Sequence, residues 1–565
     1  MYNDHFGQEL TTSFDQNGAF GLATNIGNPA GLETVATSPR VESMSGQGFV
    51  PNFNTIPTVD VAGNQVYEPA PPAKFPETPP TSFATGGFCI CWGVDSSLKT
   101  PYSYALDLSY QRQFGKNNSL EVAYIGHLGR RLLVQEDVAQ PMNLTDTKSK
   151  VTYFQAVQAL AKLYDSPNPP ASSTLTDAQV GPMAAYWHDM VQAPQPGGSY
   201  MLTCSGGATQ SPVQAIYDLY SCFAYNETTA LAWFDEPSYV SPGYVGIPDA
   251  QNTLFCGAAG YPPCVAPFYG PTTGGNSYYD GQYSSLYAWR TLSNSNYNGL
   301  QVTFKRQMAS GLQMNLNYTY SKAINLASDA ERIGPWGGFG TGQIINAWDP
   351  NQLRAVSDFD LRHQFNANWV WQVPVGRSRH FGSGMSKGLD ALIGGWQISG
   401  LARWTSGFPV NVATGYFWST DWQLGGQADL TGSPVPQGRT LTNSNVFPET
   451  PCTSFASGCV YNMFSNQSAA LAGFAHNETG ESGVRNAIRG DGYASTDLGL
   501  DKTWTMPYND HHTLEFEWNV FNVANQIRFD GQSAFPEIDE VSQFGNYDHL
   551  FTNPRVMQFG LRYAF

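Results

Sequence analysis

The last twelve residues of the chain, Pro554 to Phe565, read PRVMQFGLRYAF and alternate strictly between two kinds of side chain. The apolar and aromatic set is Met557, Phe559, Leu561, Tyr563 and Phe565. Successive side chains of a β-strand point to opposite faces, so this period of two predicts a strand with one apolar face. The fold therefore depends on what that apolar face touches.

The same alternation recurs upstream in LQMNLNYTYS (residues 312–321) and in TLEFEWNV (residues 513–520). Weaker versions cover residues 104–111, 120–125, 300–307, 361–373, 396–405 and 496–504. Together these segments predict about nine strands, or nine to ten if a partial barrel includes one more. Alternation alone is also compatible with a soluble sandwich or propeller.

The two faces of these segments favour a membrane barrel over a soluble sheet. The apolar face carries Leu and Phe, with Tyr and Trp near the strand ends, as expected where rings lie at two lipid-water boundaries. The opposite face is polar and is predicted to line an aqueous lumen. Its predicted lumen-facing residues are Gln313, Asn315, Asn317, Glu515, Glu517 and Arg562.

The connections between strands alternate in length, as they do in outer-membrane barrels with short periplasmic turns and long extracellular loops. We therefore expect an all-β, antiparallel transmembrane β-barrel over residues 101–565, preceded by an irregular extracellular segment over residues 1–100. Residues 129–295 are predicted to form a loop with a small helical cap, because capping signals such as Thr176 with Gln179 occur there. Residues 411–494 are predicted to form a second long loop.

Composition excludes several other classes of protein. Only 13% of the 565 residues are charged and the net charge is −17, which argues against a nucleic-acid partner. No run of 18 apolar residues is present, which excludes a helical membrane protein. The hydrophobic share of 41% excludes general disorder.

All eight cysteines are expected in the long loops or the N-terminal segment, and none of them on a strand. An oxidising environment there favours disulfides. The preferred local pairs are Cys204 with Cys222, Cys256 with Cys264, and Cys452 with Cys459, although connectivity cannot be deduced from sequence. A zinc site at Cys89 and Cys91 is a weaker alternative, because it needs further ligands.

No catalytic, cofactor or metal site emerges, and the chain is expected not to be an enzyme. Residues 384–388, GMSKG, match the pattern of a nucleophile elbow but lie in a turn rich in Gly and Lys instead of between a strand and a helix. The C-terminal residues Phe559, Leu561, Tyr563 and Phe565 resemble the signature that the barrel-assembly machinery recognises in bacterial outer-membrane proteins.

Several blocks also resemble the barrel region of TonB-dependent transporter-like proteins of the Oar-like type. They include PYSYALDLSYQRQFGKNNSLEVAYIGHLGRRL (residues 101–132) and YAWRTLSNSNYNGLQVTFKRQMASGLQMNLNYTYSKAI (residues 287–324). The resemblance implies a bacterial outer-membrane barrel of 22 strands around a plug, which takes up bulky nutrients. No plug-like region or TonB box is visible, so the sequence is interpreted as the C-terminal part of a longer protein, and a TonB partner is expected only if a plug lies upstream.

The resulting hypothesis is a barrel segment of a TonB-dependent transporter or receptor, with membrane lipid and the assembly machinery as partners. A surface-binding or adhesive protein anchored by its barrel is the first alternative, and a passive porin is the second. The solute stays open, since the polar face carries generic amides, hydroxyls and a few charges.

Overall fold

The protein is described here from a computed structural model. The structure describes residues 55–59, 65–69, 89–190, 211–222, 278, 283–328, 343–377, 379–415, 419–421, 425–443, 452, 458–534 and 536–565.

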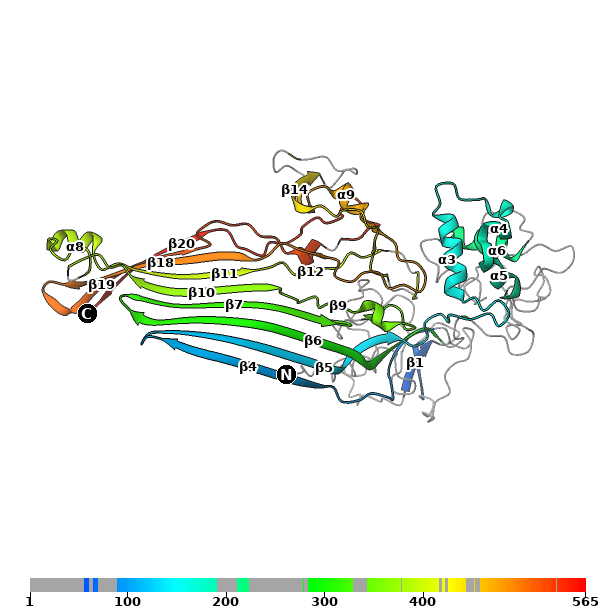
Figure 1. Ribbon diagram of the computed structural model, residues 1–565, viewed down its shortest axis with the longest axis horizontal. Coiled ribbons are helices and arrows are strands. Elements are labelled where there is room, and N and C mark those ends of the chain that lie inside the picture. Colours follow the sequence, from blue (N-terminus) through cyan, green and yellow to red (C-terminus); the bar gives the residue numbers. More distant parts are fainter. Residues whose placement is uncertain are drawn as a thin grey trace.

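Nine long strands of the described residues form one antiparallel sheet, in which neighbours along the chain are neighbours in space (Figure 1). They are β4 (Tyr102–Phe114), β5 (Asn118–Asp137), β6 (Tyr283–Ala309), β7 (Leu312–Asn325), β10 (His363–Gln372), β11 (Gln397–Thr405), β18 (Ala494–Met506), β19 (Asn509–Phe521) and β20 (Val556–Ala564). Each of the nine predicted segments overlaps one of these strands. The predicted antiparallel β fold is confirmed.

Shorter strands extend or cover this sheet. On the sheet, β3 (Cys89–Val94) pairs with β6, β8 (Gln343–Ile344) with β5, and β9 (Ala355–Val356) with β7. Separate two-stranded pairs are β1 (Thr55–Val59) with β2 (Gln65–Pro69), β12 (Pro409–Val410) with β17 (Ile488–Arg489), β13 (Asp429–Leu430) with β16 (Phe474–Ala475), and β14 (Gln437–Asn443) with β15 (Cys459–Phe464).

These short strands correct two expectations. The segment 1–100, predicted to be irregular, contains β1, β2 and β3, and cysteines do occur on strands, since Cys89 and Cys91 lie in β3 and Cys459 begins β15. The physical reason is that β3 is held by pairing with the far end of β6, about 190 residues later, and such a partner leaves no local pattern.

The strand register keeps the apolar face continuous across the sheet. Tyr124 of β5, for example, pairs with Leu108 on one side and Leu300 on the other. In a soluble sheet this face would be buried by a second layer. Instead Leu561 is 70% exposed, and Leu316 and Phe516 are only half-buried.

The buried hydrophobic clusters of the described residues lie outside the middle of the sheet. One fills the helical cap. A second lies in the described parts of the loops 406–493 and 522–555, which we call the loop layer. A third lies where the ends of β5 and β6 meet residues 326, 344, 345 and 353. The soluble-sandwich alternative therefore fails, because among the described residues the middle of the sheet shares no buried core with a second layer.

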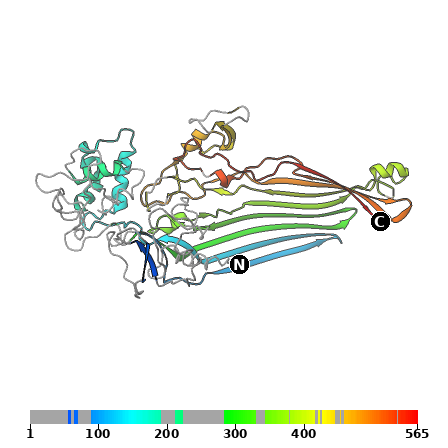
Figure 2. The ribbon, with the colours of Figure 1, turned by 180° about the vertical axis from the view of Figure 1, so that it is seen from behind.

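Short and long connections lie at opposite ends of the sheet, as Figures 1 and 2 show. The turns 115–117, 310–311 and 507–508 and the described part of the connection 373–396 lie at one end. The described parts of the loops 138–282, 326–362, 406–493 and 522–555 lie at the other. Strands β4 and β20 form the two edges, and no pairing among the described residues joins them.

The predicted helical cap is present in the first long loop. It consists of α3 (Tyr153–Tyr164), η3 (Ser172–Thr174), α4 (Asp177–Val180), η4 (Gly181–Met183), α5 (Ala184–Met190) and α6 (Pro212–Cys222). The capping box of Thr176 with Gln179 begins α4 as expected, and a second box at Thr152 begins α3.

The remaining elements are η7 (Pro350–Leu353), α8 (Lys387–Ile393), α9 (Gln467–Leu471) and η8 (Gly531–Ala534). Among the described helices none has the length and apolar character needed to cross a membrane.

Candidate functional site on the inner wall and at the rim

The polar face of the nine-stranded sheet, here called the inner wall, follows directly from the strand register. One row of paired residues crosses seven strands and is polar at every position: Gln111, Glu121, Thr303, Asn317, Asn366, Arg403 and Ser495. The next row points the other way and is apolar at every position: Tyr110, Val122, Val302, Tyr318, Phe365, Trp404 and Ala494. A sheet with one polar face and one apolar face suits a boundary between water and lipid.

The six predicted lumen-facing residues all fall on the inner wall. Asn317 belongs to the polar row itself and lies 3.1 Å from Thr303 Oγ1, which donates to its side-chain oxygen. Glu515 pairs directly with Arg562 across β19 and β20, and Glu517 pairs with Asp501 of β18. The structure thus brings these groups onto one surface, while a contact with solute stays a prediction.

A hollow of about 660 Å³ lies against the inner wall. Its polar lining includes Lys305, Gln313, Asn315, Ser399, Asp497 and Asn519. Gly499 helps to leave this space, because a Cβ there would stand 2.4 Å from Ser399 Oγ. The side-chain oxygen of Asn315 is buried without a hydrogen-bond partner among the described residues, so it is available to accept from a solute or from water.

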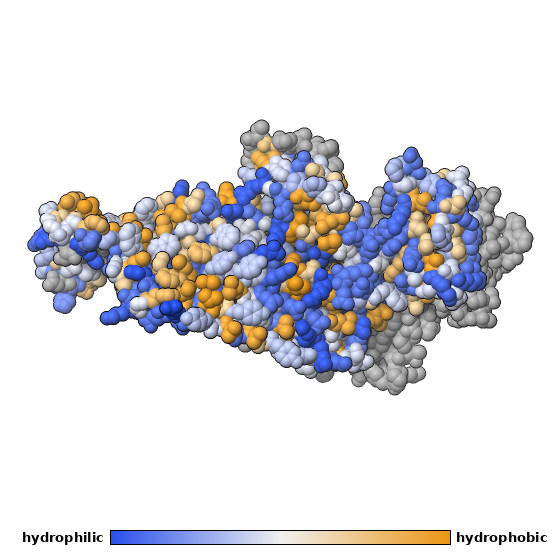
Figure 3. All heavy atoms as spheres, viewed as in Figure 1, coloured by the Kyte–Doolittle hydropathy of each residue, from blue (hydrophilic) through white to orange (hydrophobic). Residues whose placement is uncertain are grey.

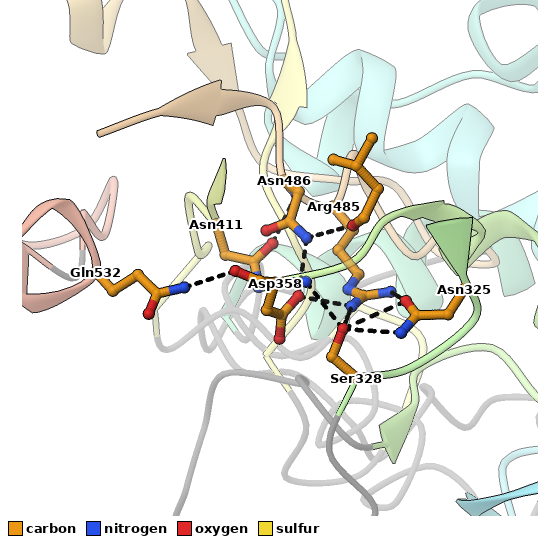
Figure 4. A network of polar contacts seen from close by, with 8 residues as sticks. Asn325, Ser328, Asp358, Asn411, Arg485, Asn486 and Gln532 are labelled. Carbon is orange, nitrogen blue, oxygen red and sulfur yellow. Dashed lines mark hydrogen bonds and ion pairs between the residues drawn. The ribbon is translucent and has the colours of Figure 1, made fainter. Parts of the chain in front are cut away.

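At the long-loop end, Arg485 of the loop between β11 and β18 binds the connection between β7 and β10 through the network drawn in Figure 4. Its guanidinium donates to Asn325 Oδ1 at 2.9 Å, to Ser328 Oγ at 2.5 Å and to Asp358 Oδ1 at 2.6 Å. The side chain of Arg485 is 1% exposed. We call Asn325, Ser328, Asp358, Arg485 and Asn486 the rim network.

Neighbouring groups extend the rim network. Asn486 Nδ2 donates to Asp358 Oδ1 at 2.8 Å, and its backbone N–H donates to Asn411 Oδ1 at 2.7 Å. Gln532, from the loop between β19 and β20, donates to the backbone carbonyl of Asp358 at 2.8 Å. These bonds hold the loops together at the mouth of the wall.

A turn over residues 478–481 attaches the helical cap to the loop layer. Gln158 of α3 donates to the carbonyl of Thr479 at 2.7 Å, and Lys162 lies 3.7 Å from Glu478. Gly480 has a φ of 86°, and a Cβ there would stand 2.5 Å from the ring of Phe154. Glycine at this position therefore permits the cap to approach closely.

Carboxylates gather beside this turn. Burial is the main reason why the pKa of Asp429 rises to about 6, and the nearby Glu481 and Glu478 raise it further. Burial also raises the pKa of Glu478, against the opposing effect of Lys162. No group of three or more His, Cys, Asp or Glu side chains within the described part of the chain is arranged to hold a metal ion.

The predicted disulfide residues are only partly described. Cys452 and Cys459 form a disulfide with their Cα atoms 6.2 Å apart. Cys222, in α6, is also disulfide-bonded. Cys204, Cys256 and Cys264 lie outside the described residues, so their predicted pairing stays a prediction.

The four residues of the predicted assembly signal lie at one edge of the sheet. Phe559, Leu561 and Tyr563 share the apolar face of β20, and Phe565 follows the strand with 91% of its surface exposed. Trp518 of β19 stacks on Phe559 with ring centroids 5.7 Å apart. The structure shows these side chains accessible, and their recognition by assembly machinery stays a prediction.

Sequence reasoning missed the rim network entirely. A signal existed: the block RNAIRG, residues 485–490, places two arginines in a chain that has only 28 basic residues. Arg489 likewise pairs with Asp360 and donates to the carbonyl of Gly407 at 3.0 Å.

Comparison with known proteins gives one family. The family model described as "Outer membrane beta barrel domain" matches residues 2–186 and 229–558. A solved structure, the outer membrane transporter YddB from Escherichia coli, aligns at 8% identity with a TM-score of 0.28, over 84% of this chain and 34% of that one. The chain thus spans about a third of the length of that transporter. The comparison with curated proteins found no match.

Proposed function

The chain belongs to the outer membrane β-barrel domain family, and from this premise we propose that it forms part of the wall of a transporter for a bulky solute. The family places the protein in the bacterial outer membrane, in contact with lipid. The observation that carries the proposal is the polar row of seven residues across seven strands, because it lines one side of the wall with hydrogen-bonding groups.

The geometry favours a wide lumen. The nine strands leave β4 and β20 unpaired with each other among the described residues, and unpaired edges are costly in lipid. Further strands that pair with both edges would enclose a larger lumen than nine strands could. This supports uptake of a bulky solute, and the resemblance to Oar-like TonB-dependent transporters supplies the proposed energy source.

Uptake and its energy source can be tested together. Cells that produce the protein are expected to accumulate a candidate solute, such as a labelled oligosaccharide or peptide, and dissipating the proton-motive force is expected to abolish the accumulation. Accumulation that survives dissipation, with ion conductance in planar bilayers, would indicate a passive porin. Protein that stays soluble in the periplasm would contradict the barrel itself.

A second candidate is a surface-binding protein in which the barrel only anchors the loops. The helical cap favours it, because the cap has its own buried cluster, including Trp187, Tyr186 and Leu160. Deleting residues 149–232 separates the two candidates. Loss of attachment with uptake intact supports binding, whereas loss of uptake with attachment intact supports transport.

A further inference from the structure

The connection between β10 and β11 differs from the other turns at its end of the sheet, because it folds into a helix. We call residues 379–395 the α8 turn. Ser386 caps the helix, since its side chain accepts from the N–H of Leu389 at 3.3 Å. Outer-membrane barrels place short connections in the periplasm, so this turn lies at the inner leaflet.

The α8 turn packs against the outside of the sheet. Lys502 and Trp504 of β18 have the same orientation as Phe516 and Leu561, which is that of the apolar face. Lys502 Nζ donates to the carbonyl of Ala391 at 2.7 Å and to that of Asp390 at 3.1 Å. Trp504 Nε1 donates to the carbonyl of Ala391 at 2.8 Å.

This packing explains a lysine on a lipid-facing surface. Lys502 is 3% exposed, and its ammonium lies 5.3 Å and 5.2 Å from the ring centroids of Trp396 and Trp504. A cation at the C-terminal carbonyls of a helix is favourable, and rings of Trp beside it add a cation–π attraction. The lysine therefore holds α8 on the outer side of the wall.

The surface of α8 that remains uncovered is apolar. Leu389, Leu392 and Ile393 have the spacing of one helical face and are 46%, 71% and 46% exposed, and Phe381 is 58% exposed. Figure 3 shows apolar atoms gathered on one side of this segment. Such a face in water is unfavourable unless something covers it.

The charges around this face identify its occupant. Arg379 and Lys387 are exposed in the turn, and Arg377 lies two residues before it, whereas Asp390 already accepts from the backbone N–H of Arg377 at 2.7 Å. Basic residues around an apolar helical face are typical of helices that lie in a membrane interface. The neighbouring Trp396 and Trp504 continue the face into the aromatic belt of the wall.

We propose that α8 inserts Leu389, Leu392 and Ile393 into the inner leaflet of the outer membrane, among anionic phospholipids, and acts as an interfacial anchor for the β10–β11 connection. Lys502 positions the helix on the lipid side, and Arg377, Arg379 and Lys387 attract the lipid phosphates. The inference goes beyond transport and does not depend on the solute.

The test uses the full chain in phosphatidylcholine vesicles with or without phosphatidylglycerol. Single cysteines at Leu392→Cys, Lys116→Cys and Leu106→Cys are labelled without reductant with an environment-sensitive fluorophore. Lys116 is an exposed residue in another turn at the same end, and Leu106 lies on the apolar face of β4 with 63% exposure. Quenching is measured with aqueous iodide and with doxyl lipids.

The fluorescence emission of the label at position 392 is expected to shift to the blue, to be protected from iodide and to be quenched by a doxyl group near the headgroup. All three effects should be larger in vesicles that contain phosphatidylglycerol. The label at position 116 should remain open to iodide. The double variant R377E/K387E is expected to lose the dependence on phosphatidylglycerol.

Three results would overturn the anchor. Equal iodide access at positions 392 and 116 would place α8 in water. Protection from iodide without doxyl quenching would mean that a protein, either a second copy or a periplasmic partner, covers the face. A blue shift and quenching that are the same with and without phosphatidylglycerol would contradict the role of the basic residues. If the label at position 106 is also not quenched by a doxyl group deep in the acyl chains, the wall itself is not in lipid. This control separates failure of the barrel from failure of the anchor.

Discussion

At the scale of single residues, the buried Arg485 is the most consequential side chain at the loop end. It is nearly inaccessible, yet it meets one carboxylate and two neutral acceptors from two other parts of the chain. A buried charge is tolerated only when it is paired and hydrogen-bonded. Arg485 in turn supplies hydrogen bonds to Asn325 Oδ1 and Asp358 Oδ1, so the stability of the network depends on both sides of these contacts.

Replacing Arg485 by methionine is expected to destabilise the loop layer by roughly 3 kcal/mol, because Asp358 loses the guanidinium that neutralises it and keeps the neutral donor Asn486. Urea titration of the protein in vesicles, with hydrogen exchange of residues 325–328 and 356–358, would measure the loss. Arg485→Lys should keep only part of the stability that Arg485→Met loses, since an ammonium lacks the planar set of donors of a guanidinium. The matched control is Arg555→Met, at an exposed arginine, and an equal loss there would contradict the argument.

Asp429 makes the loop layer sensitive to pH. Its pKa is raised from 3.8 to about 6 in the folded protein, so the folded state holds a proton that the unfolded state has released. Stability of the loop layer is therefore expected to fall as the pH rises from about 4 to about 6 and to level off above.

Hydrogen exchange of residues 426–431 and 474–483, corrected for the intrinsic pH dependence of exchange, would follow this effect. Asp429→Asn is expected to flatten the profile, because it removes the titrating carboxyl group and keeps the shape of the side chain. A profile that is the same in the variant would assign the pH dependence to another group.

At the scale of elements, glycines allow three loop segments to cross at the mouth of the wall. A Cβ at Gly407 would stand 1.9 Å from the carbonyl oxygen of Gly490, and one at Gly490 would stand 2.5 Å from the Cα of Gly531. These neighbours are backbone atoms, so they cannot move aside as a flexible side chain could. The crossing lies where β12 pairs with β17, next to η8.

Gly490→Ala is expected to cost roughly 1–3 kcal/mol, as overpacking does, and to loosen the contact between residue 490 and Gly531 of η8. Limited proteolysis of the loops and urea titration would measure the change. Gly384→Ala is the matched control, because a Cβ there meets nothing within 4 Å. Similar losses in both variants would show that the close approach is not the cause.

At the scale of the whole molecule, the two faces of one wall meet different solvents. Leu316 and Asn317 are neighbours on β7, with Leu316 on the apolar face and Asn317 in the polar row. They offer a matched pair, since the same substitution can be placed on either side at the same depth.

Leu316→Arg is expected to weaken folding into vesicles by about 2–4 kcal/mol, the cost of arginine facing lipid near the midplane. Asn317→Arg should change folding little, because its side chain faces water. The fraction folded in vesicles at increasing urea measures both. Equal costs would mean that the two faces do not meet lipid and water.

Much of the fold could be predicted because the signal is local. Alternation in segments such as residues 312–321 depends only on neighbours in the chain, and it located all nine long strands and their polar faces. The capping box at Thr176 located α4 for the same reason, because its partner lies three residues away.

The contacts that matter most for the loops and for α8 carry no such local signal. Arg485 and Asn325 are 160 residues apart in sequence, and Lys502 and Ala391 are 111 apart. No periodicity records which distant partner a side chain will meet.

By itself, the sequence determined the strands, their apolar and polar faces, and the division into short turns and long loops. These features depend on side-chain alternation and turn composition, which act between adjacent residues. Only the tertiary structure decided which rows align into a continuous inner wall, which loops Arg485 joins, and that α8 folds onto the outer surface. Those features follow from strand register and from pairing between distant segments, which become defined when the whole chain is assembled.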